Sequence, residues 1–367
     1  MGSSELTSFM NLSMDCNAET RENGVCYGLA VCGFCYNFGE TREVSKEYDQ
    51  FNLVVIGLML PCIGCLGLIG NLLSAFTYSR REMVSSLNVY LFALACSDTV
   101  IILTAFFLFF LENMRKRSEW ATYYFAVLSP VMFPLGLTAQ TLSVFITVAS
   151  AFDCFVLVAA SEKFKSKFCS VKTSIMILMV IVKVAVLYNA PHMFEIYVID
   201  CYSLMYKTTS KDVCPTDLRA NEDYVRIYYV YMYTIFMAVG PVILLIVINS
   251  AIVMKMRNAT GPSSDSDIVT LVLVVCLFIT CNILPLTVNF LELIFGIINS
   301  YLIDLSNLMV VVNSSCNFLI YYAFGSNFRR TLRNYVKNAL SRRHNLAPNN
   351  RSPPRVKLCL PPTEHLI

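Results

Sequence analysis

The sequence predicts an all-α membrane protein: a bundle of seven transmembrane helices with an extracellular N-terminus and an amphipathic helix after the last span. Two observations carry this prediction. The 367 residues are 56% hydrophobic and only 14% charged, with a mean hydropathy of +0.59, whereas a soluble domain carries about 25% charged residues. The apolar residues also fall into seven blocks, each long enough to cross a ~30 Å hydrocarbon core as a helix.

The seven blocks are separated by charged or turn-rich breaks. We expect spans at about residues 52–78, 86–111, 122–158, 173–198, 225–255, 267–296 and 301–324. In residues 326–340 apolar side chains and arginines recur at helical spacing, which is typical of a helix that lies on anionic membrane lipids. The chain then divides into an extracellular segment 1–50, a membrane domain 51–340, and a polar, proline-containing cytoplasmic tail 341–367 that should be disordered.

The positive charges orient the bundle. Within about 20 residues of the spans, one set of connections holds 14 Lys and Arg residues and the other holds 9, and the richer set is expected in the cytoplasm. Residues 1–50 contain eight acidic and three basic residues, which agrees with an extracellular position. Asn11 in Asn11-Leu-Ser13 is therefore a predicted glycosylation site. The chain should be a multi-pass protein of the plasma membrane.

Cysteines are numerous on the predicted outer side. Six of the fifteen lie there, which allows up to three disulfides in an oxidising compartment. They are Cys16, Cys26, Cys32, Cys35, Cys201 and Cys214. The pairing of the first four is left open.

Several function classes are disfavoured by composition. A net charge of +3 is too small to indicate a nucleic-acid partner. The sequence has only three histidines and no H-E-x-x-H metalloprotease motif, so we do not expect an enzyme. A retinal-type pump needs a lysine in the last span, and residues 301–324 contain none. Transporters usually consist of two duplicated halves, and this sequence shows no such repeat. The opposite charges of Asp98 and Lys183 within the spans nevertheless leave that class open.

Polar residues inside the predicted spans are costly and therefore indicate function. Asp98 lies deep in the second span and Ser143 in the third, and three polar residues of the seventh span share one stripe. Those three are Asn313, Ser314 and Asn317. A carboxylate with such neutral oxygens can coordinate a small hard cation or hold a water network; the alternative is a carboxylic acid kept neutral by burial. Lys183 in the fourth span needs a partner or must snorkel to the interface.

Landmark residues occur in the order found in one receptor family. They are Gly70-Asn71, Leu94-Ala-Cys-Ser-Asp98, Pro241, Pro285 and Asn317-Phe-Leu-Ile-Tyr321. Over about residues 50–335 the chain resembles the rhodopsin-like G-protein-coupled receptors. The resemblance implies a heterotrimeric G protein as the inner partner and a sodium ion, with no other cofactor, held at Asp98, Ser143, Asn313, Ser314 and Asn317.

Departures from the family pattern affect the switch. The family's Asp-Arg-Tyr motif reads Asp153-Cys154-Phe155, so the arginine that contacts the G protein in the family is missing. By the resemblance, these three residues and Tyr321 are assigned to the activation switch that couples the receptor to the G protein. A non-signalling heteromer partner is therefore an alternative function. The cysteine that the family places near the outer end of span three is Ser129. Cys201 and Cys214 must then pair with each other or with the N-terminal cysteines, and we favour the first because both lie in one loop.

Within the superfamily, three segments look most like invertebrate, nematode-type receptors for FMRFamide-like neuropeptides. They are Val213-Cys-Pro-Thr-Asp-Leu-Arg-Ala-Asn221, Ile227-Tyr-Tyr-Val-Tyr-Met-Tyr233 and Asn313-Ser-Ser-Cys-Asn317. A chemosensory seven-helix receptor is the alternative within the fold.

An amidated peptide that ends in Arg-Phe-amide needs acids for its guanidinium, apolar walls for its ring and hydrogen-bonding groups for its amide. The outer halves of the spans offer candidate ligand-binding residues of each kind. They are Glu292, Asp304, Gln140, Glu195, Glu112 and Tyr233. Such acids and aromatics also occur at membrane interfaces simply as solvated ends and belt residues. Glu292 and Asp304 are the preferred contacts because they approach one outer mouth from adjacent spans.

Overall fold

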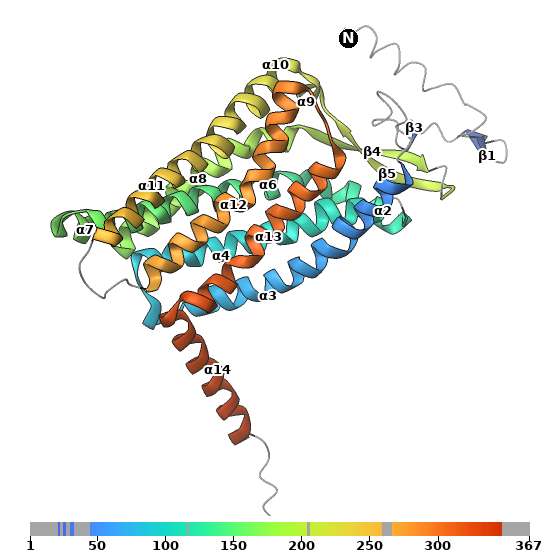
Figure 1. Cartoon of the computed structure of the whole chain (residues 1–367). Helices are drawn as coiled ribbons and strands as arrows, with labels where there is room; N and C mark the ends of the chain where they lie inside the picture. Colours follow the sequence, from blue (N-terminus) through green and yellow to red (C-terminus); the bar gives the residue numbers. More distant parts are fainter. Residues whose placement is uncertain are drawn as a thin grey trace, which may run out of the picture.

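The chain folds into the predicted bundle of helices (Figure 1). The computed structural model describes residues 21–22, 25–26, 30–32, 45–115, 117–203, 206–258 and 266–346. Within these residues seven helical spans are long and apolar enough to cross a membrane, so the predicted fold class is confirmed. They are Lys46–Tyr78, Ser86–Arg115, Glu119–Ala159, Val171–Phe194, Glu222–Arg257, Ile268–Glu292 and Ser300–Phe324.

Most spans are built from more than one helical element. Span one is α2 (Lys46–Val54), η2 (Val55–Met59) and α3 (Leu60–Tyr78), and span two is α4 (Ser86–Ala105), η4 (Phe106–Leu111) and α5 (Glu112–Arg115). Span three is α6 (Glu119–Ala159), and span four is α8 (Val171–Asn189) with η5 (Ala190–Phe194). Span five is α10 (Glu222–Tyr224), η6 (Val225–Met232), η7 (Thr234–Val239) and α11 (Gly240–Asn258). Spans six and seven are α12 (Ser266–Phe295) and α13 (Ser300–Phe324).

Four further helices join or follow the spans in the described part of the chain. They are η3 (Arg81–Met83), α7 (Glu162–Phe168), α9 (Asp217–Ala220) and α14 (Ser326–Leu346). Figure 1 shows α14 leaving the bundle at the end opposite the β-strands. This helix matches the predicted amphipathic segment but continues past residue 340. The glycosylation site predicted at Asn11, and residues 347–367 of the predicted tail, lie outside the described residues.

The outer end of span four differs from the prediction. The helix was expected to run to residue 198, but α8 ends at Asn189, a short 3₁₀ turn follows, and a strand begins at Ile196. Pro191 lies in this turn, and proline removes a backbone donor and clashes with the preceding helical turn. The residues after it therefore join a sheet instead of extending the span.

A β-hairpin covers the outer side. Strands β4 (Ile196–Ser203) and β5 (Thr208–Pro215) pair antiparallel, and β3 (Ala30–Val31) adds to β4 in parallel. A separate two-stranded ribbon pairs β1 (Arg21–Glu22) with β2 (Val25–Cys26). The N-terminal segment is thus joined to the loop between spans four and five by main-chain pairing.

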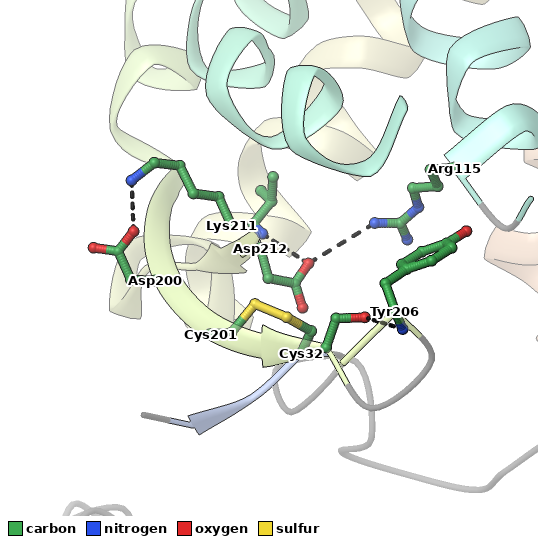
Figure 2. Close-up of a disulfide and its surroundings, with 9 residues drawn as sticks. Cys32, Arg115, Asp200, Cys201, Tyr206, Lys211 and Asp212 are labelled. Carbon is green, nitrogen blue, oxygen red and sulfur yellow. Dashed lines mark hydrogen bonds and ion pairs between the residues drawn. A yellow bond between two sulfur atoms is a disulfide. The ribbon is translucent and has the colours of Figure 1, made fainter. Parts of the chain in front are cut away.

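The disulfide predicted between Cys201 and Cys214 is wrong, because Cys201 is bonded to Cys32 (Figure 2). In the hairpin register Cys201 lies opposite Ser210, and Cys214 lies opposite Tyr197. Four residues along a strand correspond to about 13 Å, beyond the reach of a disulfide. Pairing of β3 with β4 instead brings Cys32 beside Cys201. Cys214 is also disulfide-bonded.

Polar contacts fasten the hairpin to the bundle in the absence of a cysteine at position 129. The guanidinium of Arg115 lies 3.8 Å from a carboxylate oxygen of Asp212 on β5 (Figure 2). It also lies 5.0 Å from the ring centre of Phe125 on α6. Ser129 is buried and donates its hydroxyl proton to the carbonyl of Phe125. The hairpin therefore contacts spans two and three without a disulfide to span three.

Candidate ligand-binding site

A cavity of about 330 Å³, hereafter the outer cavity, lies between the outer halves of spans three, four, five and six. Tyrosines of span five form one wall, and amide side chains and one carboxylate supply polar groups. These lining residues include Tyr228, Tyr229, Tyr233, Gln140, Asn289 and Glu292. Ligand sites of proteins are commonly concave, largely apolar and furnished with a few polar groups, so the outer cavity is the candidate ligand site.

One wall of the outer cavity is held by a buried carboxylate, Glu195, at the end of span four. Its oxygen Oε1 lies 2.8 Å from Nδ1 of His192 and accepts a hydrogen bond of 2.6 Å from the hydroxyl of Tyr224. Oε2 accepts one from the hydroxyl of Tyr229. The guanidinium of Arg219 stacks 4.0 Å from the ring centre of Tyr229 and lies 3.8 Å from Oε2. We call these five residues the Glu195 cluster.

The Glu195 cluster keeps its carboxylate ionised. Burial alone would raise the pKa of Glu195, but the hydrogen bonds from His192, Tyr224 and Tyr229 and the charge interaction with His192 outweigh it. Together they lower the pKa of Glu195 to about 2. The cluster joins the end of span four to α9 and to the start of span five, so it fixes the tyrosine wall in place.

The structure separates the six predicted ligand-binding residues. Gln140, Tyr233 and Glu292 line the outer cavity. Glu195 lies behind the wall, within its own cluster. The remaining two acids lie outside the outer cavity.

These two acids have partners in the protein. Asp304 is buried between spans one and seven and accepts a hydrogen bond of 2.8 Å from the side chain of Asn52. Glu112 forms an ion pair of 3.0 Å with Arg115 at the outer end of span two. Glu292, in contrast, is exposed, and its carboxylate makes no hydrogen bond or ion pair with the described residues.

Two basic side chains that line the outer cavity were not identified as candidates from the sequence. His192 lines the outer cavity from η5, and Arg219 lines it from α9. A signal was present for His192, because it is the only histidine in a predicted span and lies three residues before Glu195, one helical turn away. Arg219 carried no such signal, since its position depends on how the loop folds over the bundle.

Asp98 forms a second polar site at mid-bundle, deeper than the outer cavity. It is fully buried, and its two oxygens accept hydrogen bonds from the Ser143 hydroxyl (3.1 Å) and the Asn317 amide (2.7 Å). A cavity of about 20 Å³ beside it is lined by Ser143, Asn313 and Ser314. The five residues predicted for a sodium pocket therefore lie together, with oxygen donors that suit a hard cation.

The inner end of span three carries Asp153 and Cys154, two of the residues assigned to the switch. Asp153 is fully buried and accepts a hydrogen bond of 2.8 Å from the hydroxyl of Ser86 at the start of span two. Cys154 is fully buried in the hydrophobic core. Tyr321 is also fully buried, with its ring edge-on to Tyr78. The Asp153 carboxylate thus ties the inner ends of spans two and three together.

Comparison with known proteins identifies the family. Residues 70–321 match the family described as "7 transmembrane receptor (rhodopsin family)". The chain is a member of that family. It is 78% identical to the "Probable G-protein coupled receptor frpr-1" of Caenorhabditis elegans, over 98% of this chain and 99% of that protein. This confirms the predicted resemblance.

Two further relatives are named as receptors for FMRFamide peptides. The chain is 30% identical to the "FMRFamide receptor" of Drosophila melanogaster, over 81% of this chain and 56% of that protein. It is 29% identical to the "FMRFamide peptide receptor frpr-18" of C. elegans, over 74% of this chain and 67% of that protein. The chain is thus a plasma-membrane receptor with seven spans and not an enzyme, and its family implies a ligand outside and a G protein inside.

Proposed function

We propose that this receptor binds an FMRFamide-like amidated neuropeptide in the outer cavity and passes the signal to a heterotrimeric G protein. One observation carries the proposal: Glu292 is an unpaired carboxylate at the rim of a tyrosine-walled cavity. It can accept the guanidinium of a peptide arginine through charge-assisted hydrogen bonds. The tyrosines offer a wall for a phenylalanine ring, and Gln140 can hydrogen-bond a terminal amide. The names of the relatives favour the same ligand class.

The test varies peptide and receptor together. Peptides ending in Arg-Phe-amide and in citrulline-Phe-amide, which keeps the shape but lacks the charge, are compared in a second-messenger assay on cells expressing the receptor or Glu292→Gln. We expect the citrulline peptide to be about tenfold to a hundredfold weaker on the unaltered receptor, as for a lost charged hydrogen bond. On Glu292→Gln the two peptides should be equally potent. Equal potency on the unaltered receptor would exclude this role of Glu292.

Peptide binding would favour one packing of the spans over another, by the difference in its affinity for the two states. We propose that Asp98, with Ser143, Asn313, Ser314 and Asn317, holds a sodium ion in one of these states. The fully buried Asp98 carboxylate is hydrogen-bonded to Ser143 and Asn317, and Ser143, Asn313 and Ser314 line a small cavity. Replacing sodium in the medium by a large organic cation should then change peptide affinity. Asp98→Asn should remove that dependence, and a dependence that persists in this variant would contradict the sodium site.

At the inner end, the hydrogen bond from Ser86 to Asp153 would hold spans two and three together in the resting state. We expect Ser86→Ala to raise signalling in the absence of peptide. Cys154→Arg tests whether the missing arginine limits coupling: stronger peptide responses at equal surface expression would indicate a weakened switch. A receptor that stays silent to every peptide at normal surface expression would favour the chemosensory or the non-signalling alternative.

A further inference from the structure

Span four has a lipid-facing side that carries a charge. In span four only 11% of the most apolar 18-residue stretch is buried, whereas in each of the other six spans at least 33% of the corresponding stretch is buried. The helix α8 packs on α4 and α6 through few residues, and the buried ones are Ser174, Ala185 and Asn189. Lys183 is exposed, on the side that faces away from these neighbours.

The surroundings of Lys183 are apolar. Positions one and two helical turns away along its stripe carry exposed hydrophobic side chains. These are Met176, Met179, Val180, Val186 and Leu187. Within the described part of the chain the ammonium group of Lys183 makes no hydrogen bond or ion pair.

Lys183 lies near the middle of the hydrocarbon layer. It is eleven residues from Lys172 at the inner end of the helix and nine from His192 at the outer end, or about 16 Å and about 14 Å along a helix axis. A lysine side chain extends about 6 Å, so its ammonium group cannot reach either interface by snorkelling. An isolated ammonium group in lipid is strongly unfavourable, which calls for a partner outside this bundle.

A second copy of this chain does not supply that partner. Two copies that met through span four would place Lys183 against Lys183. The acids inside the bundle are buried: Asp98 and Asp153 fully, and Asp304 to all but 7%. Glu292, which is exposed, lies at the outer end of its span. Among the described residues, no carboxylate is therefore exposed at the depth of Lys183.

We propose that this face of span four docks a transmembrane helix of a different protein, and that this helix carries a carboxylate at mid-membrane depth paired with Lys183. Charge complementarity selects the partner, because only an ionised acid both satisfies the ammonium group and is itself stabilised in lipid by it. The two methionines of the stripe can adapt to the packing of a neighbouring helix. The proposal is independent of which ligand the outer cavity binds.

The test uses a designed single-span helix of leucine and alanine as the probe, with glutamate or leucine at its centre. Association of the full-length receptor with each probe is measured by energy transfer between fluorescent tags in cell membranes. We expect the glutamate probe to associate about threefold to tenfold more strongly than the leucine probe, as for polar pairs between membrane helices. Lys183→Leu should remove this preference, and Lys183→Glu should transfer it to a probe with a central lysine.

Lys172→Leu is the matched control, because it removes an exposed lysine from the inner end of the same helix and should leave the preference unchanged. Surface amount and peptide response of each variant report correct folding. Equal association of the glutamate and leucine probes with the unaltered receptor would overturn the proposal. So would labelling of Lys183 by a water-soluble amine reagent, since that would show a water path to the side chain.

Discussion

Glu195 and Glu292 are two acids at the outer end of the same bundle, and they differ in burial and in the hydrogen bonds of their carboxylates. Glu195 is fully buried and bonded to His192, Tyr224 and Tyr229. Glu292 is exposed at the outer cavity and has no partner among the described residues. A carboxylate whose hydrogen bonds are satisfied within the protein holds a wall in place, whereas an unsatisfied one remains available to a ligand.

The largest expected effect is on stability, from Glu195→Ala. The substitution leaves the imidazole and two phenol groups without their buried acceptor, so the free energy of unfolding should fall by about 3 kcal/mol. Thermal unfolding of the purified receptor measures this, and the surface amount in cells should fall with it. Unchanged thermal stability would mean that the Glu195 cluster does not hold the wall.

Glu292→Gln should give the opposite pattern. Because the side chain is exposed and unpaired, thermal stability should stay within about 0.5 kcal/mol of the unaltered receptor. Peptide affinity should fall about tenfold to a hundredfold, the loss expected for a charged hydrogen bond. Glu119→Gln is the control, since Glu119 is exposed at the outer start of span three but does not line the outer cavity. A loss of thermal stability in Glu292→Gln would show that Glu292, like Glu195, stabilises the fold, and would contradict its assignment as a residue left free for the ligand.

Tyr224 and Tyr229 sharpen the comparison, because both donate to Glu195 but only Tyr229 lines the outer cavity. Tyr224→Phe and Tyr229→Phe each remove one hydroxyl group and should each lower stability by about 1 kcal/mol. Peptide binding should change in Tyr229→Phe and not in Tyr224→Phe. Radioligand binding at matched receptor amounts distinguishes the two outcomes, and an equal loss in both would show that the wall acts as one unit.

The smallest expected effect is a dependence on pH. Since folding lowers the pKa of Glu195 to about 2, its contribution to stability is complete above the unfolded value of about 4.3. It is lost as the pH falls from there toward 2. The difference in melting temperature between the unaltered receptor and Glu195→Gln should therefore be constant from pH 8 to about pH 5 and narrow below about pH 4. A difference that already narrows between pH 7 and pH 6 would contradict this cause.

The spans were predictable because hydropathy and helical periodicity are local properties, and the lipid leaves few alternatives to a helix. The Asp98 site was predictable for a related reason, since deep polar residues in lipid are rare and have to meet one another. The outer site was predicted only in part. Asp304 was a preferred ligand contact, and no local pattern shows that Asn52 of span one donates to it.

The loops were predicted least well. The pairing of Cys201 depends on β3 joining β4, a contact between residues far apart in the sequence. The position of Arg219 over the outer cavity depends on the same hairpin. Spacing along the sequence favoured Cys214 as the partner of Cys201, because both lie in one loop, whereas the strand register places Cys32 next to Cys201.

The bond between Cys32 and Cys201 has a further consequence, because the two cysteines are 169 positions apart in the sequence and the first four spans lie between them. It closes the first half of the receptor into a covalent ring. A protease that cuts once inside that ring, for example within α7 on the cytoplasmic side, opens the ring without releasing a fragment. The cut receptor should migrate as one chain on a denaturing gel and separate into two only after reduction.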